Sequence, residues 1–109
     1  MGNLKNTKKK NHIKKAPHSA YVLRLYVVGK TPNCLSALTN LKKICDAHLP
    51  LNYEIEIIDL LQLPELAKDD QILAIPTVIR RFPKPTRKAI GDLSNLEEVL
   101  HGLDLPINK

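Results

Sequence analysis

The stretch that most constrains the fold runs from Tyr21 to Asp59. Residues Tyr21–Val28 form an almost continuous run of apolar, β-favouring side chains, which is typical of a strand buried on both faces of a sheet. Gly29–Asn33 interrupts this run, and Tyr53–Asp59 alternates between apolar and polar residues before turning apolar, as a second strand would. With a helix between the two, the segment predicts a βαβ unit whose strands are parallel.

The helix between these strands has clear start and stop signals. Thr31 can cap its N-terminus, and Pro32 suits the first helical position. We expect the helix to end near Pro50. Apolar side chains recur at spacings of three and four along it, which predicts one buried stripe. The stripe consists of Leu35, Leu38, Leu41, Cys45 and Leu49.

The second half of the chain predicts shorter elements. Leu60–Gln71 contains a proline suited to a first helical turn but ends in two aspartates, which oppose the helix dipole, so we expect a short helix there. Ser94 and Glu97 form a capping-box pattern that predicts a last helix, and Gly102 is placed to cap its C-terminus.

Between these helices, Ile72–Gly91 consists of two β-favouring runs around the break Pro83–Pro85, which predicts a hairpin. The predicted order is therefore βαβαββα, an α/β arrangement of the thioredoxin-like type. Such folds place a cis-proline where Pro76 enters its strand, so Pro76 is a candidate for a cis peptide bond, although the spacing permits this without requiring it.

Charge divides the 109-residue chain unevenly. The net charge of +6 is carried entirely by six lysines within residues 1–20, whereas residues 21–109 contain 11 basic and 11 acidic side chains. We expect residues 1–20 to be a disordered basic tail, 21–105 one domain, and 106–109 a short C-terminal tail. The basic tail can bind phosphate backbones or anionic lipid weakly, but we favour a solvated extension and expect no nucleic-acid role.

Composition excludes several classes of protein. No apolar run is long enough to span a membrane, and the N-terminus has no signal-peptide hydrophobic region. The two cysteines suit a reducing compartment, so we expect a cytoplasmic protein. No metal-binding spacing, phosphate-binding loop or catalytic triad pattern is present, so we expect neither a metal nor a cofactor.

Cys34 raises the alternative of a thiol oxidoreductase. It lies near the start of the first helix, where a thiol pKa is lowered. However, there is no C-x-x-C motif, and Cys45 lies about 16 Å further along the same helix. A disulfide requires Cα atoms within about 7 Å. We therefore favour a small residue at the start of the helix for Cys34, a core residue for Cys45, and a binding module over an enzyme.

Several short motifs occur in one order. They are Tyr21–Gly29, Thr31–Asn33, Ile58–Leu60, Ile72–Thr77, Ile90–Ser94 and Gly102–Leu105. In this order they resemble the KaiB family of circadian clock proteins, from Tyr21 to about Leu105. A similar domain begins the clock-associated sensor kinase SasA.

The resemblance implies a non-enzymatic regulator that binds the N-terminal ATPase ring of the hexameric kinase KaiC. In cyanobacteria the complex sequesters KaiA and displaces SasA. The family is metamorphic, with a tetrameric ground fold and a thioredoxin-like monomer that binds KaiC, so the resemblance also implies a homo-oligomer. A KaiB–KaiC system that serves stress adaptation is the alternative to a clock.

The resemblance also implies particular residues. Arg24, Arg80, Arg87 and Lys88 match basic surface positions that contact KaiC, with ordinary solvated strand charges as the alternative interpretation. Gly102 and Asp104 match the positions that control the fold switch. The chain departs from the cyanobacterial pattern at four positions, namely Cys34, Glu56, Gln71 and Arg81. These departures leave KaiA binding and a 24-hour clock open.

Overall fold

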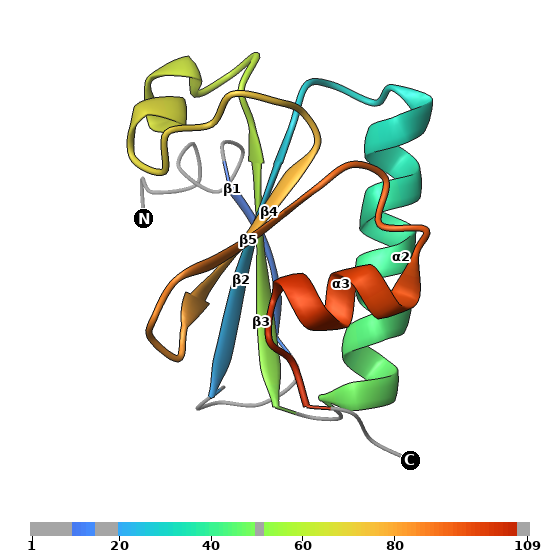
Figure 1. Cartoon of the computed structure of the whole chain (residues 1–109). Coiled ribbons are helices and arrows are strands. Elements are labelled where there is room, and N and C mark those ends of the chain that lie inside the picture. The colour runs from blue at the N-terminus through green and yellow to red at the C-terminus, as the bar shows by residue number, and fades with distance from the viewer. Residues whose placement is uncertain (1–9, 15–19, 50–51, 107–109) are drawn as a thin grey trace.

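The structure is a computed structural model that describes residues 10–14, 20–49 and 52–106. Figure 1 shows a sheet with two α-helices at one side and a short 3-10 helix at the other. The strands are β1 (Lys10–Lys14), β2 (Tyr21–Val27), β3 (Tyr53–Asp59), β4 (Thr77–Phe82) and β5 (Arg87–Ile90). The helices are α2 (Pro32–His48), η1 (Pro64–Lys68) and α3 (Leu96–Gly102).

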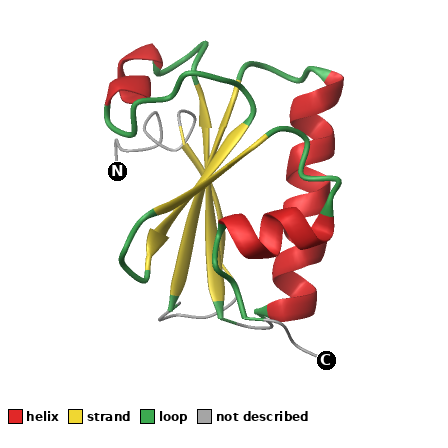
Figure 2. Cartoon of the chain, in the orientation of Figure 1, coloured by secondary structure: helices red, strands yellow, loops and turns green. Residues whose placement is uncertain are grey.

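The five strands form one mixed sheet in the order β1-β3-β2-β4-β5. β2 and β3 are parallel, as the predicted βαβ unit requires, and the other pairs are antiparallel. Both α-helices lie at the same side of the sheet (Figure 2). From Tyr21 onward the order is therefore the predicted thioredoxin-like one, which is confirmed.

Two hydrophobic clusters cover the two faces of the sheet. Side chains alternate along β2, so Leu23 and Leu25 pack in the cluster that contains the buried residues of α2 and α3. Tyr26 packs on the other face with Ile58 and Ile79, beneath partly buried residues of the η1 region. This two-sided burial explains why the β2 sequence is almost continuously apolar.

The predicted start, cap and end of α2 are confirmed, but the predicted buried stripe is wrong at Leu35, which is 48 % exposed. The buried residues of the helix are Cys34, Ala37, Leu41, Ile44 and Cys45. The Thr31 hydroxyl accepts a hydrogen bond from the Cys34 N–H at 3.3 Å, and Pro32 opens the helix. The helix ends at His48, where the N–H of Leu49 bonds to the Cys45 carbonyl.

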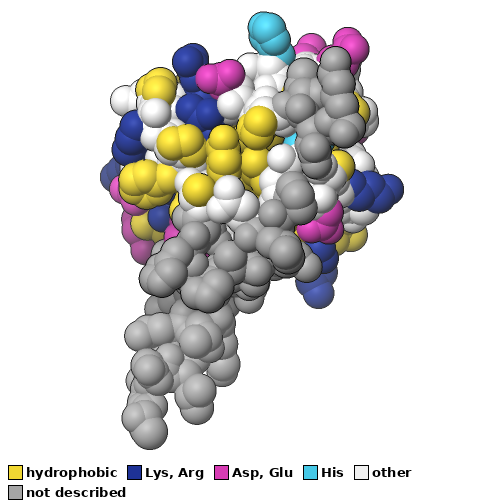
Figure 3. Space-filling model, turned by 90° about the horizontal axis from the view of Figure 1, so that it is seen from below, with side chains coloured by type: hydrophobic (Ala, Val, Ile, Leu, Met, Phe, Trp, Pro, Cys, Tyr) yellow, Lys and Arg dark blue, Asp and Glu magenta, His cyan; other side chains and the backbone are white. Residues whose placement is uncertain are grey.

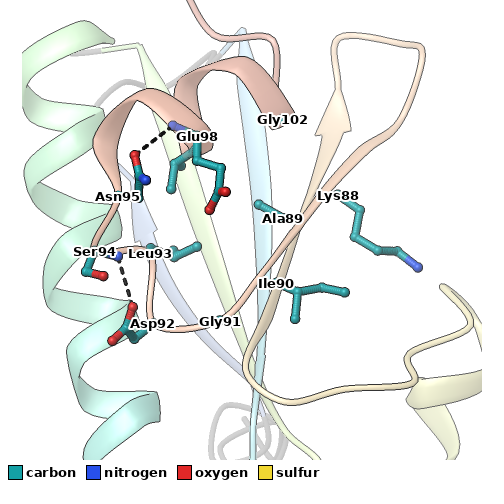
Figure 4. Close-up of a pocket in the computed structure, with 11 residues that line it drawn as sticks. Lys88, Ala89, Ile90, Gly91, Asp92, Leu93, Ser94, Asn95, Glu98 and Gly102 are labelled. Atoms are coloured by element: carbon teal, nitrogen blue, oxygen red, sulfur yellow. Dashed lines mark hydrogen bonds between the residues drawn. The ribbon is translucent and has the colours of Figure 1, made fainter.

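The predicted cap of the last helix is wrong by one residue. Asn95, with extended backbone angles, caps α3 by accepting a hydrogen bond from the Glu98 N–H at 3.1 Å. Ser94 instead donates its N–H to the Asp92 carboxylate at 3.0 Å, as Figure 4 shows. Asparagine and serine cap about equally well, so the turn at Asp92 decides between them.

The predicted disorder of residues 1–20 is wrong for Lys10–Lys14. These residues form β1, which pairs antiparallel with β3 over five register positions. The physical reason is that β3 would otherwise be an edge strand with unpaired backbone groups, and it carries Glu54 and Glu56 opposite a basic segment. Residues 1–9, 15–19 and 107–109 lie outside the described residues, so the tail predictions for them stay predictions.

The predicted hairpin is present as β4 and β5. The Ile75–Pro76 peptide bond that precedes β4 is cis, and so are the bonds before Pro83 and Pro85 in the turn. The Gly91 N–H bonds to the Pro76 carbonyl at 2.9 Å. Gly91 has φ +108°, which L side chains rarely adopt, so the chain leaves β5 at a position that favours glycine.

Candidate partner-binding surface

Arg24 lies in a network of charged and polar side chains on the sheet face that carries η1. Its Nε donates to Glu56 Oε1 at 2.9 Å, and its Nη1 donates to the Tyr26 hydroxyl at 3.2 Å. Tyr26 in turn donates to Asp70 Oδ2 at 2.8 Å. Arg81 Nη1 lies 3.3 Å from the same Asp70 oxygen. The strands β2, β3 and β4 and the loop after η1 are thus joined through two carboxylates.

Burial and hydrogen bonding together set the pKa values of Arg24 and Tyr26. Burial of the Arg24 guanidinium disfavours its charge, but the bonds to Tyr26 and Glu56 outweigh this and raise its pKa. The pKa of Tyr26 is also raised, chiefly by burial and further by the hydrogen bond to Asp70. Only 8 % of Arg24 is exposed. The interpretation of Arg24 as a surface cation is therefore wrong, because its charge is already neutralised inside the domain.

Arg80 is also buried, with 3 % of the residue exposed, and it lies on the opposite face of the sheet. Its Nη1 donates to the Asp104 carbonyl at 2.9 Å, and its Nη2 donates to the Pro85 carbonyl at 2.8 Å. Its Nε is buried without a partner in the described structure. Arg80 therefore ties the segment after α3 to the hairpin turn, and the interpretation as a surface cation is wrong for it as well.

Arg87 and Lys88 are exposed, as a partner-binding role requires. Both lie on β5, which is an edge strand of the sheet. Figure 4 shows the Lys88 side chain pointing away from α3, whereas Ala89 points toward it. The Lys88 ammonium lies 3.5 Å from the Asp70 carbonyl oxygen, so one cation at this edge lies next to the charged network.

A groove of about 360 Å³ separates β5 from α3. Ala89, Leu93 and Val99 supply apolar wall, while Asp92 and Glu98 supply carboxylates. Gly102 also lines the groove (Figure 4). The strand that carries the exposed cations Arg87 and Lys88 therefore also lines a groove that contains carboxylates.

Gly102 and Asp104 lie at the end of α3, where the predicted C-terminal cap at Gly102 is wrong. Gly102 is the last helical residue, and its φ lies outside the left-handed region, so Gly102 is not the expected left-handed cap. Asp104 has that conformation, with φ +52°, and its N–H bonds to the His101 carbonyl at 3.1 Å. Aspartate adopts this conformation more readily than most non-glycine residues, which explains the exchange of roles.

A second pocket lies at the start of α2 and is lined by Cys34 and by Ile75, the residue before the cis-proline Pro76. Cys34 is only 3 % exposed and belongs to the core cluster on the helix face, as does Cys45. Burial raises the pKa of the Cys45 thiol to about 12. Both cysteines are free. Cys45 is the predicted core residue, and Cys34, predicted as a small residue at the start of the helix, is buried as well. The geometry offers no exposed thiol pair for exchange chemistry.

The described residues contain neither a cluster of metal-binding side chains nor a membrane-spanning helix. Within the described ranges, no group of three or more His, Cys, Asp or Glu side chains could hold a metal ion. No helix in the part of the chain that the structure describes is long and apolar enough to cross a membrane.

Some hydrophobic side chains are exposed on the surface. Figure 3, which views the molecule from below, shows hydrophobic side chains gathered at that end. Separately, Phe82 at the end of β4 is 48 % exposed.

Sequence reasoning missed the network around Tyr26 and Asp70. Part of the signal was present, because parallel strands in register place Arg24 opposite Glu56. Asp70 gave no such signal, because it lies in a loop 44 residues from Tyr26 and its position depends on tertiary folding.

These features define an α/β domain of the thioredoxin-like class, with a buried cysteine and a basic edge strand. Structure comparison supports this class. The chain is similar to mitochondrial thioredoxin 3 from Saccharomyces cerevisiae, with a TM-score of 0.62 at 18% identity over 79% of this chain and 78% of that one. It is also similar to the N-terminal domain of Synechococcus elongatus SasA, with a TM-score of 0.64 at 18% identity over 79% of this chain and 85% of that one.

Sequence comparison identifies the family within this class. The KaiB domain model matches residues 24–105, and the chain belongs to the KaiB family. A relative from Prochlorococcus marinus, named circadian clock oscillator protein KaiB, is 48% identical over 83% of this chain and 77% of its own length. A relative of the same name from Picosynechococcus is 53% identical over 78% of this chain and 82% of its own length. The resemblance to KaiB is thereby confirmed.

Proposed function

We propose that the chain is a non-enzymatic regulator that binds the ATPase ring of a KaiC-type kinase and modulates its phosphorylation. The observation that carries this proposal is the KaiB domain match over residues 24–105. The proposed setting is the cytoplasm, in circadian timing or in stress adaptation.

The contact surface in this proposal is the β5 edge with Arg87 and Lys88. These cations are exposed, whereas Arg24 and Arg80 have their charges engaged inside the domain. We assign Arg24 and Arg80 a positioning role. Arg24 pairs with Glu56 and with Asp70 in the loop after η1. Arg80 ties the segment after α3 to the hairpin turn. Exposed complementary charges chiefly raise the association rate and discriminate between partners.

Charge reversal at the edge tests this assignment. Arg87→Glu/Lys88→Glu should weaken binding to a cognate KaiC-type ATPase by at least tenfold, mainly through slower association. Lys42→Glu/Lys43→Glu makes the same change in net charge at two exposed positions on α2 and should change binding less than threefold. Both variants should keep the thermal transition of the parent protein.

Biolayer interferometry at two salt concentrations would give the rates. Equal loss of binding in both variants would show that net charge matters and the β5 edge does not. No binding of the parent protein to any KaiC-type ATPase would overturn the proposed function itself.

The alternative, a thiol oxidoreductase that uses Cys34, fits the structure less well. Cys34 is buried in the core, and a resolving thiol must approach to disulfide distance, which Cys45 on the same helix does not. Cys34→Ser should therefore leave KaiC binding within twofold of the parent. Insulin reduction by the parent protein that disappears in Cys34→Ser would favour the enzyme instead.

Two further parts of the proposal concern assembly. We propose that the thioredoxin-like structure is the form that binds the kinase and that a second, oligomeric fold exchanges with it, with Gly102 and Asp104 setting the balance. A SasA-like kinase, whose N-terminal domain shares this fold, is the expected competitor for the same ring, and KaiA remains a candidate partner of the complex. Competition binding with both proteins would test these partners.

A further inference from the structure

The outer edge of β3 is occupied by a strand from the same chain. β3 pairs with β2 on one side and with β1 on the other. Without β1, the sheet order would begin at β3, and one row of β3 backbone N–H and C=O groups would have no strand partner. The five register pairs run from Lys10 opposite Ile58 to Lys14 opposite Glu54.

β1 lies outside the family domain. The KaiB match begins at residue 24, whereas β1 spans residues 10–14. Its composition also differs from the domain, since residues 1–20 carry the whole net charge of +6. The register sets Lys14 opposite Glu54, so a lysine position of β1 is paired with a glutamate position of β3. Opposite charges at directly paired positions favour strand pairing.

We propose that the β3 edge is a docking surface for an extended basic strand, which β1 fills within the same molecule and thereby withholds from other strands. The inference goes beyond kinase binding, because β3 and β5 lie toward opposite edges of the sheet. Strand addition at an open edge draws its affinity from main-chain hydrogen bonds and its specificity from alternate side chains. The occupant to which we commit is the β1 segment itself, in cis or supplied in trans.

A strand tethered to its own site competes at an effective concentration in the millimolar range. A free peptide of the same sequence at micromolar concentration therefore cannot displace it from the wild-type protein. In a variant whose β1 segment cannot pair with β3, the same peptide should bind to the β3 edge. Competition between cis and trans strands thus gives the proposal a direct measurement.

The test uses the full chain with Asn11→Pro/Ile13→Pro, because proline removes ladder donors and disfavours strand pairing. The matched control is Asn3→Pro/Asn6→Pro, which adds the same residues before β1. Hydrogen exchange by NMR would follow alternate β3 amides, which face β1. Fluorescence anisotropy would follow a labelled peptide of residues 7–16 and a scrambled peptide of the same composition.

We expect the Asn11→Pro/Ile13→Pro variant to lose protection at alternate β3 amides and to bind the peptide at least tenfold more tightly than the wild type and the control. Unchanged protection would overturn the proposal, because β1 would then not cover the edge. Loss of protection without peptide binding would also overturn it. If the scrambled peptide bound as tightly as the peptide of residues 7–16, binding would depend on charge alone, and the proposal would be overturned.

Discussion

Tyr53 shows how one buried hydroxyl couples the fold to pH. Its side chain is fully buried, and its hydroxyl donates to Asp46 Oδ1 at 2.5 Å. Burial, and then this hydrogen bond to a carboxylate, raise the pKa of Tyr53 well above its ordinary value near 10. In the unfolded chain, Tyr53 loses its proton near pH 10, whereas in the folded chain it keeps it to higher pH.

We therefore predict that Tyr53 adds no pH dependence to the free energy of unfolding below about pH 10 and lowers this free energy as pH rises above that value. The slope from this residue is at most about 1.4 kcal/mol per pH unit, because the folded state alone still holds the proton. Urea denaturation between pH 8 and 11 would measure it, with Tyr53→Phe as the comparison because it cannot titrate. The parent and Tyr53→Phe curves should converge at high pH. Parallel curves would contradict the prediction.

The η1 segment shows how an element without a core of its own is held in place. No residue of η1 itself is buried, and its partly buried neighbours pack on Tyr26, Ile58 and Ile79. Asp70 supplies the polar part of this attachment, because its carboxylate accepts from Tyr26 and lies beside Arg81. A buried carboxylate is favourable only while such donors surround it.

We predict that Asp70→Ala lowers the free energy of unfolding by about 1–3 kcal/mol, because Arg81 loses its carboxylate acceptor and the Tyr26 hydroxyl is left with the Leu66 carbonyl alone. The matched control is Asp69→Ala, at the exposed neighbouring carboxylate, which should change stability by less than about 0.5 kcal/mol. Urea denaturation gives both values. Equal effects would show that Asp70 does not anchor η1. The larger effect should be accompanied by faster hydrogen exchange in residues 60–72.

At the scale of the whole molecule, the C-terminal end of α3 contacts both β5 and, through Arg80, the turn of the β4–β5 hairpin. Arg80 holds the carbonyl of Asp104 against the hairpin turn, and Gly102 packs beside β5. A Cβ added at Gly102 would lie 3.6 Å from the Lys88 carbonyl and 3.9 Å from Ala89 Cβ, which are ordinary contacts. Alanine therefore fits this form of the protein, and it favours helix over glycine.

We predict that Gly102→Ala stabilises the thioredoxin-like form by up to about 1 kcal/mol, which corresponds to about fivefold in its population relative to a competing fold. If that form is the minor one, association with a KaiC-type ATPase should speed up by the same factor. NMR of the free protein and stopped-flow binding measure the two effects. Gly91→Ala is the contrasting control, because φ +108° makes alanine strained there and the thioredoxin-like form should lose stability.

Two opposing effects are expected for Asp104→Arg. A cation near the C-terminal end of α3 is favourable by about 0.3–1 kcal/mol. However, φ is +52° at this position, and arginine tolerates the left-handed conformation less well than aspartate. The two effects oppose each other, so Asp104→Arg should add little to Gly102→Ala in the same NMR measurement. A large additive shift would mean that charge dominates at this helix end.

The sequence by itself determined the βαβ unit, the cap at Thr31, the hairpin and the family. Each depends on short-range patterns, such as apolar periodicity and turn residues, which act within a few residues along the chain. Only the tertiary structure decided that Arg24 and Arg80 are buried and that Lys10–Lys14 forms a strand. The Arg24–Glu56 and Tyr26–Asp70 contacts join residues 32 and 44 positions apart, and the surroundings of a charge depend on such long-range partners. For the same reason, of the four candidate contact residues only Arg87 and Lys88 retain exposed charges.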